Sequence, residues 1–137
     1  GSILVGDTDA IAEARRIRKT FGGGMRQVGV IAAAGLVALD EVLPELGEDN
    51  RRARALADRL AGIPGVALDP ESVETNIICF GFAENAELSA GELAAALADE
   101  GVLVHALGRD FVRMVTHYHI TDKDIIRAGD AVARVMS

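Results

Sequence analysis

The sequence predicts an α/β chain whose second half forms a small α+β unit, and three observations support this prediction. Apolar runs with helical spacing are interspersed with short, nearly continuous apolar runs, in the order β-α-α-α-β-β-α-β-β-α. Half of the 137 residues are hydrophobic but only 4% are aromatic, so Ala, Val, Ile and Leu must build the core. Most of the short runs follow residue 63, where they predict a three- or four-stranded, largely antiparallel sheet with two helices on one face.

The first part of the chain is predicted to hold one strand and three helices. Residues 3–5 are apolar and partly β-branched, as in the tail of a buried strand; a single strand cannot satisfy its own backbone, so it needs a sheet that this chain does not supply. Asp7 is expected to cap a helix that ends at the glycines 22–24. Further helices are expected over about 25–42 and 45–63.

The rest of the chain is expected to alternate short strands with helices. The predicted strands are 66–68, 76–82, 102–105 and 111–115, and the predicted helices run from Ser89 to about Glu100 and from Thr121 or Asp122 to about Met136. The strand 76–82 is nearly continuous in apolar residues, which predicts a central strand covered on both faces, with Cys79 in the core. The domains are predicted as residues 1–63, the end of a larger domain with its connecting helices, and residues 64–137, a small α+β domain.

Charge and composition exclude several classes of function. The formal net charge of −7 disfavours a nucleic-acid or anionic-membrane partner. Neither a run long enough for a membrane helix nor a signal-peptide pattern is present. Cys79 is the single cysteine of the sequence, so the chain can form neither an internal disulfide nor a Cys-based zinc site, and a reducing, cytoplasmic setting fits best.

Arg113 is a candidate binding residue. It lies inside the apolar run 111–115, and strand alternation places it on the same face as Phe111 and Val115. A guanidinium among apolar neighbours is costly unless it meets an anion, and its planar fork suits a carboxylate or a phosphate. The alternative is an edge strand on which Arg113 reaches solvent or pairs with a structural acid.

Lys19 and Arg26 flank the glycines 22–24. Two cations beside a Gly-rich turn at the start of a helix resemble an anion site, because the backbone N–H groups and the helix dipole add to the side-chain charge. The alternative is that Lys19 is a surface residue that compensates the helix dipole and that the glycines only cap the first helix.

The histidines and Cys79 carry weaker signals. His117 and His119 would share one face of a strand and could ligate zinc, but no third ligand has suitable spacing, so no metal site is predicted. Buried, hydrogen-bonded histidines are expected instead, and His105 is included in this expectation. Cys79 lies in the middle of a strand, where a thiolate would be poorly stabilised, so it is not expected to be a nucleophile.

Several segments together resemble the low-specificity L-threonine aldolases. They are Gly-Ser-Ile-Leu-Val-Gly at 1–6, Glu-Ala-Arg-Arg-Ile-Arg-Lys at 13–19, Gly-Gly-Gly-Met-Arg-Gln-Val-Gly at 22–29, Thr-Asn-Ile at 75–77 and Val-Arg-Met-Val-Thr-His at 112–117. This resemblance implies the aspartate aminotransferase-like fold type I of pyridoxal-phosphate enzymes, of which the chain would be the C-terminal part. It also implies a homotetramer.

The resemblance further implies retro-aldol cleavage of L-threonine or L-allo-threonine to glycine and acetaldehyde, with pyridoxal phosphate as cofactor. Arg113 matches the family arginine that binds the carboxylate of the amino-acid substrate. Lys19 and Arg26 match basic residues that the family directs toward the active site of a neighbouring subunit, near the cofactor phosphate. No role for His105 or His119 follows from it, and His117 is expected to be structural.

The chain also departs from the family pattern. The lysine that forms the Schiff base with the cofactor lies upstream of residue 3 in the family, and neither Lys19 nor Lys123 stands at its position. We therefore expect a larger polypeptide of which this chain, inactive alone and without catalytic residues, is the C-terminal part. Two alternatives stay open: another β-hydroxy-amino-acid aldolase or β-eliminating lyase of the same fold, and a non-enzymatic small-ligand-binding α+β module.

Overall fold

The structure, a computed structural model, describes residues 3–83 and 88–137 and divides the chain into two units, Gly1–Leu43 and Pro44–Ser137. The first unit holds α1 (Thr8–Thr20), α2 (Gly29–Val37) and the π-helix Ala38–Val42. The second holds α3 (Leu46–Ala61), β1 (Val66–Ala67), a 3-10 turn (Pro70–Ser72), β2 (Ile77–Phe82), α4 (Ala90–Asp99), β3 (His105–Leu107), β4 (Phe111–Val115) and α5 (Asp122–Met136). None of the helices in the described ranges is long and apolar enough to cross a bilayer.

The start of the first unit confirms one prediction and contradicts another. The Asp7 side chain accepts a hydrogen bond from the Ala10 backbone N–H at 2.8 Å, so Asp7 caps α1 as expected. The predicted strand at 3–5 is wrong, because the structure gives these residues no strand. A strand needs a partner strand to pair with, and every strand of the described sheet belongs to the second unit.

The helix predicted over 25–42 begins later and changes its winding before its end. It starts at Gly29 and continues as a π-helix over Ala38–Val42, where the Leu43 N–H bonds to the Ala38 carbonyl five residues back. Pro44 follows at once. Proline has no N–H to continue an α-helical ladder, so the chain passes into a 3-10 turn, Leu43–Glu45, at the boundary between the units, while Leu43 itself keeps an α-helical conformation.

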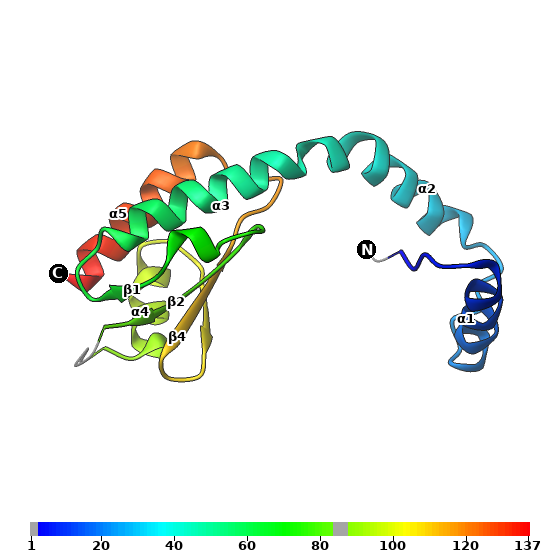
Figure 1. Cartoon of the computed structure of the whole chain (residues 1–137), viewed down its shortest axis with the longest axis horizontal. Coiled ribbons are helices and arrows are strands. Elements are labelled where there is room, and N and C mark those ends of the chain that lie inside the picture. The colour runs from blue at the N-terminus through cyan, green and yellow to red at the C-terminus, as the bar shows by residue number, and fades with distance from the viewer. Residues whose placement is uncertain (1–2, 84–87) are drawn as a thin grey trace. The chain divides into compact units, whose positions relative to one another are not determined.

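The four strands form one antiparallel sheet, which confirms the predicted sheet type, and their order is β1-β2-β4-β3. β2 and β4 are the central strands, and alternation along them gives the sheet two different faces. Ile78 and Phe80 of β2 and Val112 and Met114 of β4 are buried on one face. α3, α4 and α5 pack on this face, and Figure 1 shows α3 and α5 running side by side across it.

α3 belongs to the second unit because its apolar stripe is buried there. The stripe consists of Ala53, Leu56, Ala57 and Leu60. Exposed ion pairs such as Arg59 with Asp130, at 2.6 Å, also join α3 to α5. The sequence assigns this helix to the part before residue 64 and expects two helices on the sheet, whereas the structure packs three.

Both later helices begin with the same reciprocal cap. In α4 the Ser89 hydroxyl accepts the backbone N–H of Glu92, and the Glu92 carboxylate accepts the backbone N–H of Ser89. Thr121 and Asp124 repeat this arrangement in α5, so Thr121 is its N-cap. These capping boxes satisfy N–H groups that no helical carbonyl can reach.

β3 lies further along the chain than predicted. The strand expected at 102–105 is His105–Leu107 in the structure, paired with β4 through the turn at Gly108, whose φ is 70°. The Val102 N–H instead bonds to the Leu97 carbonyl at 2.9 Å, which uses this segment to close the end of α4. That bond keeps the segment from extending β3.

A buried hydrogen-bond network ties α3 to the end of β4. The Thr116 hydroxyl donates to the Asp49 backbone carbonyl at 2.7 Å, and the Asn76 side-chain amide donates to the Thr116 carbonyl at 2.6 Å. The Thr116 N–H bonds in turn to the Asn76 carbonyl at 3.0 Å. Thr116 is 1% exposed and Asp49 5% exposed, so each of these groups would be left without water if its partner were lost.

Replacing Thr116 with Val should therefore destabilise the protein by about 1 kcal/mol or somewhat more, because the buried Asp49 carbonyl loses the hydroxyl donor. Urea unfolding of the complete protein measures the change. Thr75→Val is the matched control, because Thr75 is exposed and only accepts a 3.3 Å bond from Ile77. Equal losses in the two variants would contradict a role for the network.

The capping boxes should also make the protein less stable in acid. Hydrogen bonds from Ser89 hold the pKa of Glu92 below its usual value of 4.5, and those from Thr121 hold the pKa of Asp124 below 3.8. A lowered pKa in the folded state contributes stability above the unfolded value, which is lost as pH falls through the folded value. The urea concentration at the midpoint of unfolding should thus decrease as the pH falls below about 4.5. This decrease should be less steep in a Glu92→Gln, Asp124→Asn double variant than in the exposed control variant Glu74→Gln.

Candidate functional site

Arg113 lies on the face of the sheet opposite the one on which the helices of the second unit pack. In β4 the residues Val112 and Met114 point into the core, so Phe111, Arg113 and Val115 point the other way, as the sequence predicts. We call this side, with the alternate residues of β2 and β3 that share it, the open face. The described helices of the second unit, α3, α4 and α5, all pack on the opposite face.

The register of the strands arranges the open face in three rows. The middle row runs across the sheet through Cys79, Arg113 and His105. One flanking row pairs Ile77 with Val115, and the other contains Gly81, Phe111 and Leu107. The four large apolar side chains of these rows are 38–55% exposed. Arg113 therefore stands in a polar row between two apolar rows.

The Arg113 side chain is partly buried and incompletely bonded. Its Nε atom is shielded from solvent and has no hydrogen-bond partner among the described residues. A buried donor without a partner costs free energy, so an acceptor supplied to this guanidinium from outside would stabilise the position. A carboxylate fits this need, because it can accept two parallel N–H bonds from a guanidinium.

Gly81 makes room for the ring of Phe111, one of the apolar side chains beside Arg113. A Cβ atom at Gly81 would lie 3.2 Å from Cε1 of Phe111 and 3.4 Å from the Asp110 carbonyl, so the Phe111 ring lies against the backbone of β2. This contact fixes one wall beside Arg113. The apolar run of the sequence does not show it, because the packing depends on which residue of β2 faces Phe111.

Cys79 corrects a prediction. The sequence suggests a core position within a strand covered on both faces, but Cys79 is exposed on the open face. The physical reason is the alternation of β2, in which Ile78 and Phe80 take the core side and leave Cys79 beside Arg113. A continuous apolar run does not reveal which of its residues face outward.

Lys19 and Arg26 lie in the first unit, whereas Arg113 belongs to the second, so the structure does not group the three residues into one described site. Lys19 is in the last turn of α1, and Arg26 lies in the turn before α2 rather than in the first turn of that helix. Both side chains are exposed and have no ion-pair partner within residues 3–83 and 88–137.

The glycines between them shape the turn. Gly22 has φ 80°, in the left-handed region, and the Gly23 N–H bonds to the Arg18 carbonyl at 2.8 Å, as in a glycine-ended helix. A Cβ on Gly23 would lie 2.8 Å from Cγ of Arg18, so this position admits no side chain without a shift. The glycines therefore cap α1, and they also allow the chain to turn closely beside Lys19.

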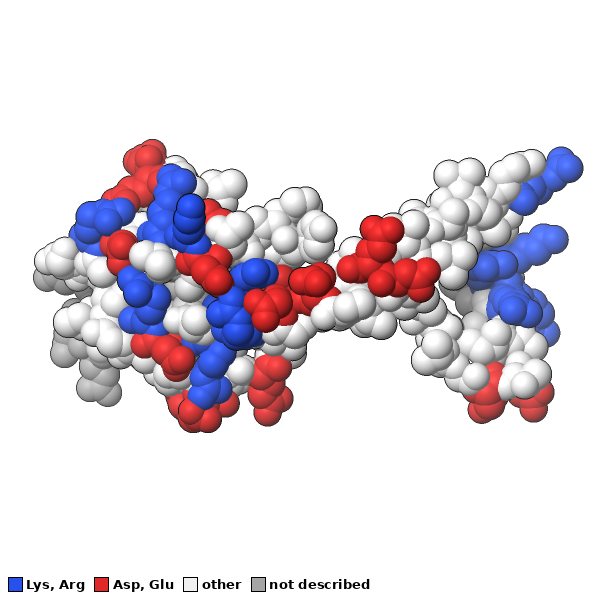
Figure 2. All heavy atoms as spheres, turned by 90° about the horizontal axis from the view of Figure 1, so that it is seen from above, with Lys and Arg blue, Asp and Glu red and all other residues white. Residues whose placement is uncertain are grey.

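Basic side chains accumulate around this turn. Arg15, Arg16, Arg18, Lys19 and Arg26 fall within twelve residues of sequence, and Figure 2 shows the Lys and Arg side chains of this unit gathered on one side of it. Arg16 pairs with Glu13 at 2.7 Å. The other four carry no such pair in the described structure, so this basic patch can take an anion.

The three histidines are all exposed. This contradicts the expectation that they are buried. His117 and His119 lie edge to face with ring centroids 5.7 Å apart, and the His119 N–H approaches Nδ1 of His117 at 3.4 Å. Over the described residues, no group of three His, Cys, Asp or Glu side chains could hold a metal ion.

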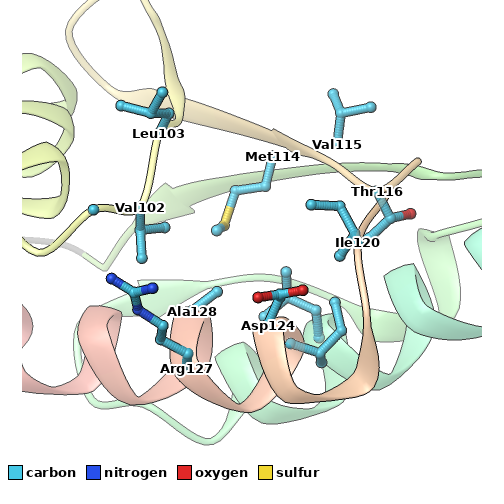
Figure 3. Close-up of a pocket in the computed structure, with 12 residues that line it drawn as sticks. Val102, Leu103, Met114, Val115, Thr116, Ile120, Asp124, Arg127 and Ala128 are labelled. Atoms are coloured by element: carbon cyan, nitrogen blue, oxygen red, sulfur yellow. The ribbon is translucent and has the colours of Figure 1, made fainter. Parts of the chain in front are cut away.

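A cavity of about 160 Å³ lies beside β4 on the helix side of the sheet. Figure 3 shows Met114 directed into it, with Val102 on one wall and Asp124 and Arg127 of α5 on another. The polar groups are already engaged: Asp124 bonds to Thr121, and Arg127 donates to the Glu100 carbonyl at 2.7 Å. This cavity therefore offers a ligand few free polar groups, and Arg113 does not line it.

Comparisons with known proteins show which family the chain resembles. The family of beta-eliminating lyases matches residues 1–85. Low-specificity L-threonine aldolase 1 of Arabidopsis thaliana is 40% identical over 125 residues, which cover 91% of this chain and 35% of that protein. Low specificity L-threonine aldolase of Escherichia coli (strain K12) is 36% identical with the same coverage. The chain thus spans about a third of the length of these relatives.

A further relative and a solved structure extend these matches. Aldolase vrtJ of Penicillium aethiopicum is 36% identical over 142 residues, covering 99% of this chain and 34% of that protein. The structure of MppP soaked with the product 2-ketoarginine matches with a TM-score of 0.55 and 17% identity, covering 72% of this chain and 30% of that one. The family and this likeness confirm the predicted fold class.

Proposed function

The chain belongs to the beta-eliminating lyase family, and we propose that the complete protein is an L-threonine aldolase that cleaves L-threonine or L-allo-threonine to glycine and acetaldehyde with pyridoxal phosphate. The named relatives support this proposal, since several are threonine aldolases at 36–43% identity over 91% of the chain. The observation that carries it within the chain is the buried, unpartnered Nε of Arg113 on the open face.

Arg113 is proposed to bind the carboxylate of the amino-acid substrate. Its fork would hold the carboxylate at two points, which fixes the orientation of the whole substrate. The Cα–Cβ bond could then be held in the one direction in which its electrons can leave toward the cofactor. Ile77, Val115 and Phe111 border this position, and coverage of the open face by the rest of the complete protein would exclude water there and strengthen the attraction between the two charges.

Pyridoxal phosphate, when bound, supplies an electron-accepting ring that stabilises the charge released from the broken bond. Within this chain, Lys19 and Arg26 are proposed to hold its phosphate, in the active site of a neighbouring subunit. They fit this role because both cations are exposed and lack acidic partners in the described structure, and because the basic patch surrounds a turn tightened by Gly23. No proton transfer is assigned to this chain.

Three coarser features are part of the same proposal. Residues 1–63 would end the large cofactor-binding domain and supply its connecting helices, and residues 64–137 would form the small domain on which α3 packs. The complete protein would be a cytoplasmic homotetramer. Its partners would be the amino-acid substrate and the rest of the same polypeptide, without nucleic acid or membrane.

An activity assay tests the proposed function directly. The complete protein, loaded with pyridoxal phosphate, should release acetaldehyde from L-threonine and from L-allo-threonine, detected by a coupled alcohol dehydrogenase. A protein that carries the cofactor but cleaves neither amino acid, while it cleaves another β-hydroxy amino acid, would show a different aldolase of this fold. A protein that binds no cofactor would contradict the proposal as a whole.

Arg113→Ala should lower kcat/KM for L-threonine by about a hundredfold, which corresponds to about 2.8 kcal/mol, mainly through a higher KM. Arg113→Lys should lie between this variant and the wild type, because Lys keeps the charge and loses the fork. Arg109→Ala is the matched control, since Arg109 is exposed in the β3–β4 turn. Kinetics of Arg113→Ala close to those of the control would refute the carboxylate assignment.

Lys19→Ala and Arg26→Ala should each weaken the binding of pyridoxal phosphate about tenfold, because a cation that contacts the phosphate is lost. Titration of the apoprotein with the cofactor, followed by absorbance, measures this. Arg16→Ala removes a neighbouring cation that already pairs with Glu13 and should change the affinity little. The assignment fails if Arg16→Ala weakens binding as much as the other two variants.

A further inference from the structure

His105 is the nearest polar neighbour of Arg113 on β3. The register pairs the two residues directly, and both lie on the open face. Residues opposite each other in an antiparallel pair have Cβ atoms about 4.5–5.5 Å apart. The imidazole of His105 and the guanidinium of Arg113 can therefore contact the same small anion.

Among the residues around Arg113 on the open face, His105 is the principal additional hydrogen-bond donor. The flanking rows present Ile77, Val115, Phe111 and Leu107, whose side chains cannot bond to an anion. Cys79, on the other side of Arg113, has a short side chain whose S–H is a weak donor. An imidazole always carries at least one N–H, whatever its protonation state.

His105 is also free to serve this purpose. It is exposed, and its side chain makes no hydrogen bond or ion pair to the residues that the structure describes. β3 is one of the two edge strands of the sheet, so no further described strand pairs with its outer side. A carboxylate held by two N–H groups of Arg113 keeps lone pairs that can accept another bond.

We infer that His105 is a second binding residue of the same site and donates one hydrogen bond to the substrate carboxylate beside Arg113. This inference rests on the proposed function. The carboxylate would then be bound by residues of two neighbouring strands, because Arg113 lies in β4 and His105 in β3. The hairpin turn at Gly108 then sets the spacing of the two donors.

Three variants of the complete enzyme test the inference. His105→Leu removes the donor and should raise KM for L-threonine about tenfold, with kcat changed less than about twofold, since a hydrogen bond to a charged group is lost. His105→Gln keeps an N–H donor and should restore KM to within about threefold of the wild type. His119→Leu, an exposed histidine outside the row, is the matched control.

Inhibition by acetate separates contact with the carboxylate from other effects on the enzyme. Acetate has neither the amino group nor the hydroxyl of the substrate, so its competitive inhibition constant reports the carboxylate contact alone. His105→Leu should raise this constant by about the same factor as KM. Arg113→Ala should raise it at least as much, because it removes the charged fork.

The outcomes distinguish the inference from the proposed function. If Arg113→Ala raises KM and the acetate constant while His105→Leu changes neither beyond the His119→Leu control, the inference fails and the carboxylate site at Arg113 stands. If Arg113→Ala also changes neither, the carboxylate site itself is refuted, and the inference with it. A His105→Leu variant that loses kcat and thermal stability at unchanged KM, or one that His105→Gln does not rescue, also overturns the inference.

Discussion

The antiparallel pairing of β2 with β4 is the constraint on which the second unit depends. Because side chains alternate along a strand, the residues that fill the core under the helices, such as Val112 and Met114, force Arg113 to the opposite face. A shift of one residue in this register would bury a guanidinium among aliphatic side chains and expose the core. The register that buries the core therefore also fixes the position of Arg113, the proposed binding residue.

The network around Thr116 continues this constraint beyond the sheet. It begins one residue after β4 ends, and through Asp49 it reaches the first turn of α3. Asp49 is nearly buried, and Arg52 approaches its carboxylate only to 3.9 Å. The favourable field at the start of a helix accounts for a carboxylate in this position. As a result, the strand that carries Arg113 and the helix that covers its core are held by one set of bonds.

Sequence patterns predict the parts of this structure that depend on local chemistry. The Ser89–Glu92 capping box occurs at its expected residues, Thr121 is one of the two expected caps of α5, and the alternation of β4 places Arg113 as expected, because each feature involves neighbours in the chain. Features that depend on distant partners are harder. Whether Cys79 is covered depends on packing on both sides of the sheet, and the pairing of His105 with Arg113 depends on a turn that starts β3 later than its apolar residues suggest.

The apolar side chains on either side of Arg113, such as Phe111 and Val115, affect how strongly Arg113 would attract a carboxylate. Two opposite charges 4 Å apart attract by about 1 kcal/mol in water and by about 4 kcal/mol at the lower effective dielectric near a protein surface. While the open face is exposed, a carboxylate at Arg113 gains mainly the first amount. If another part of the complete protein covers Phe111 and Val115, the same contact would strengthen. If Arg113 binds the carboxylate as proposed, binding and coverage of the open face should therefore favour each other.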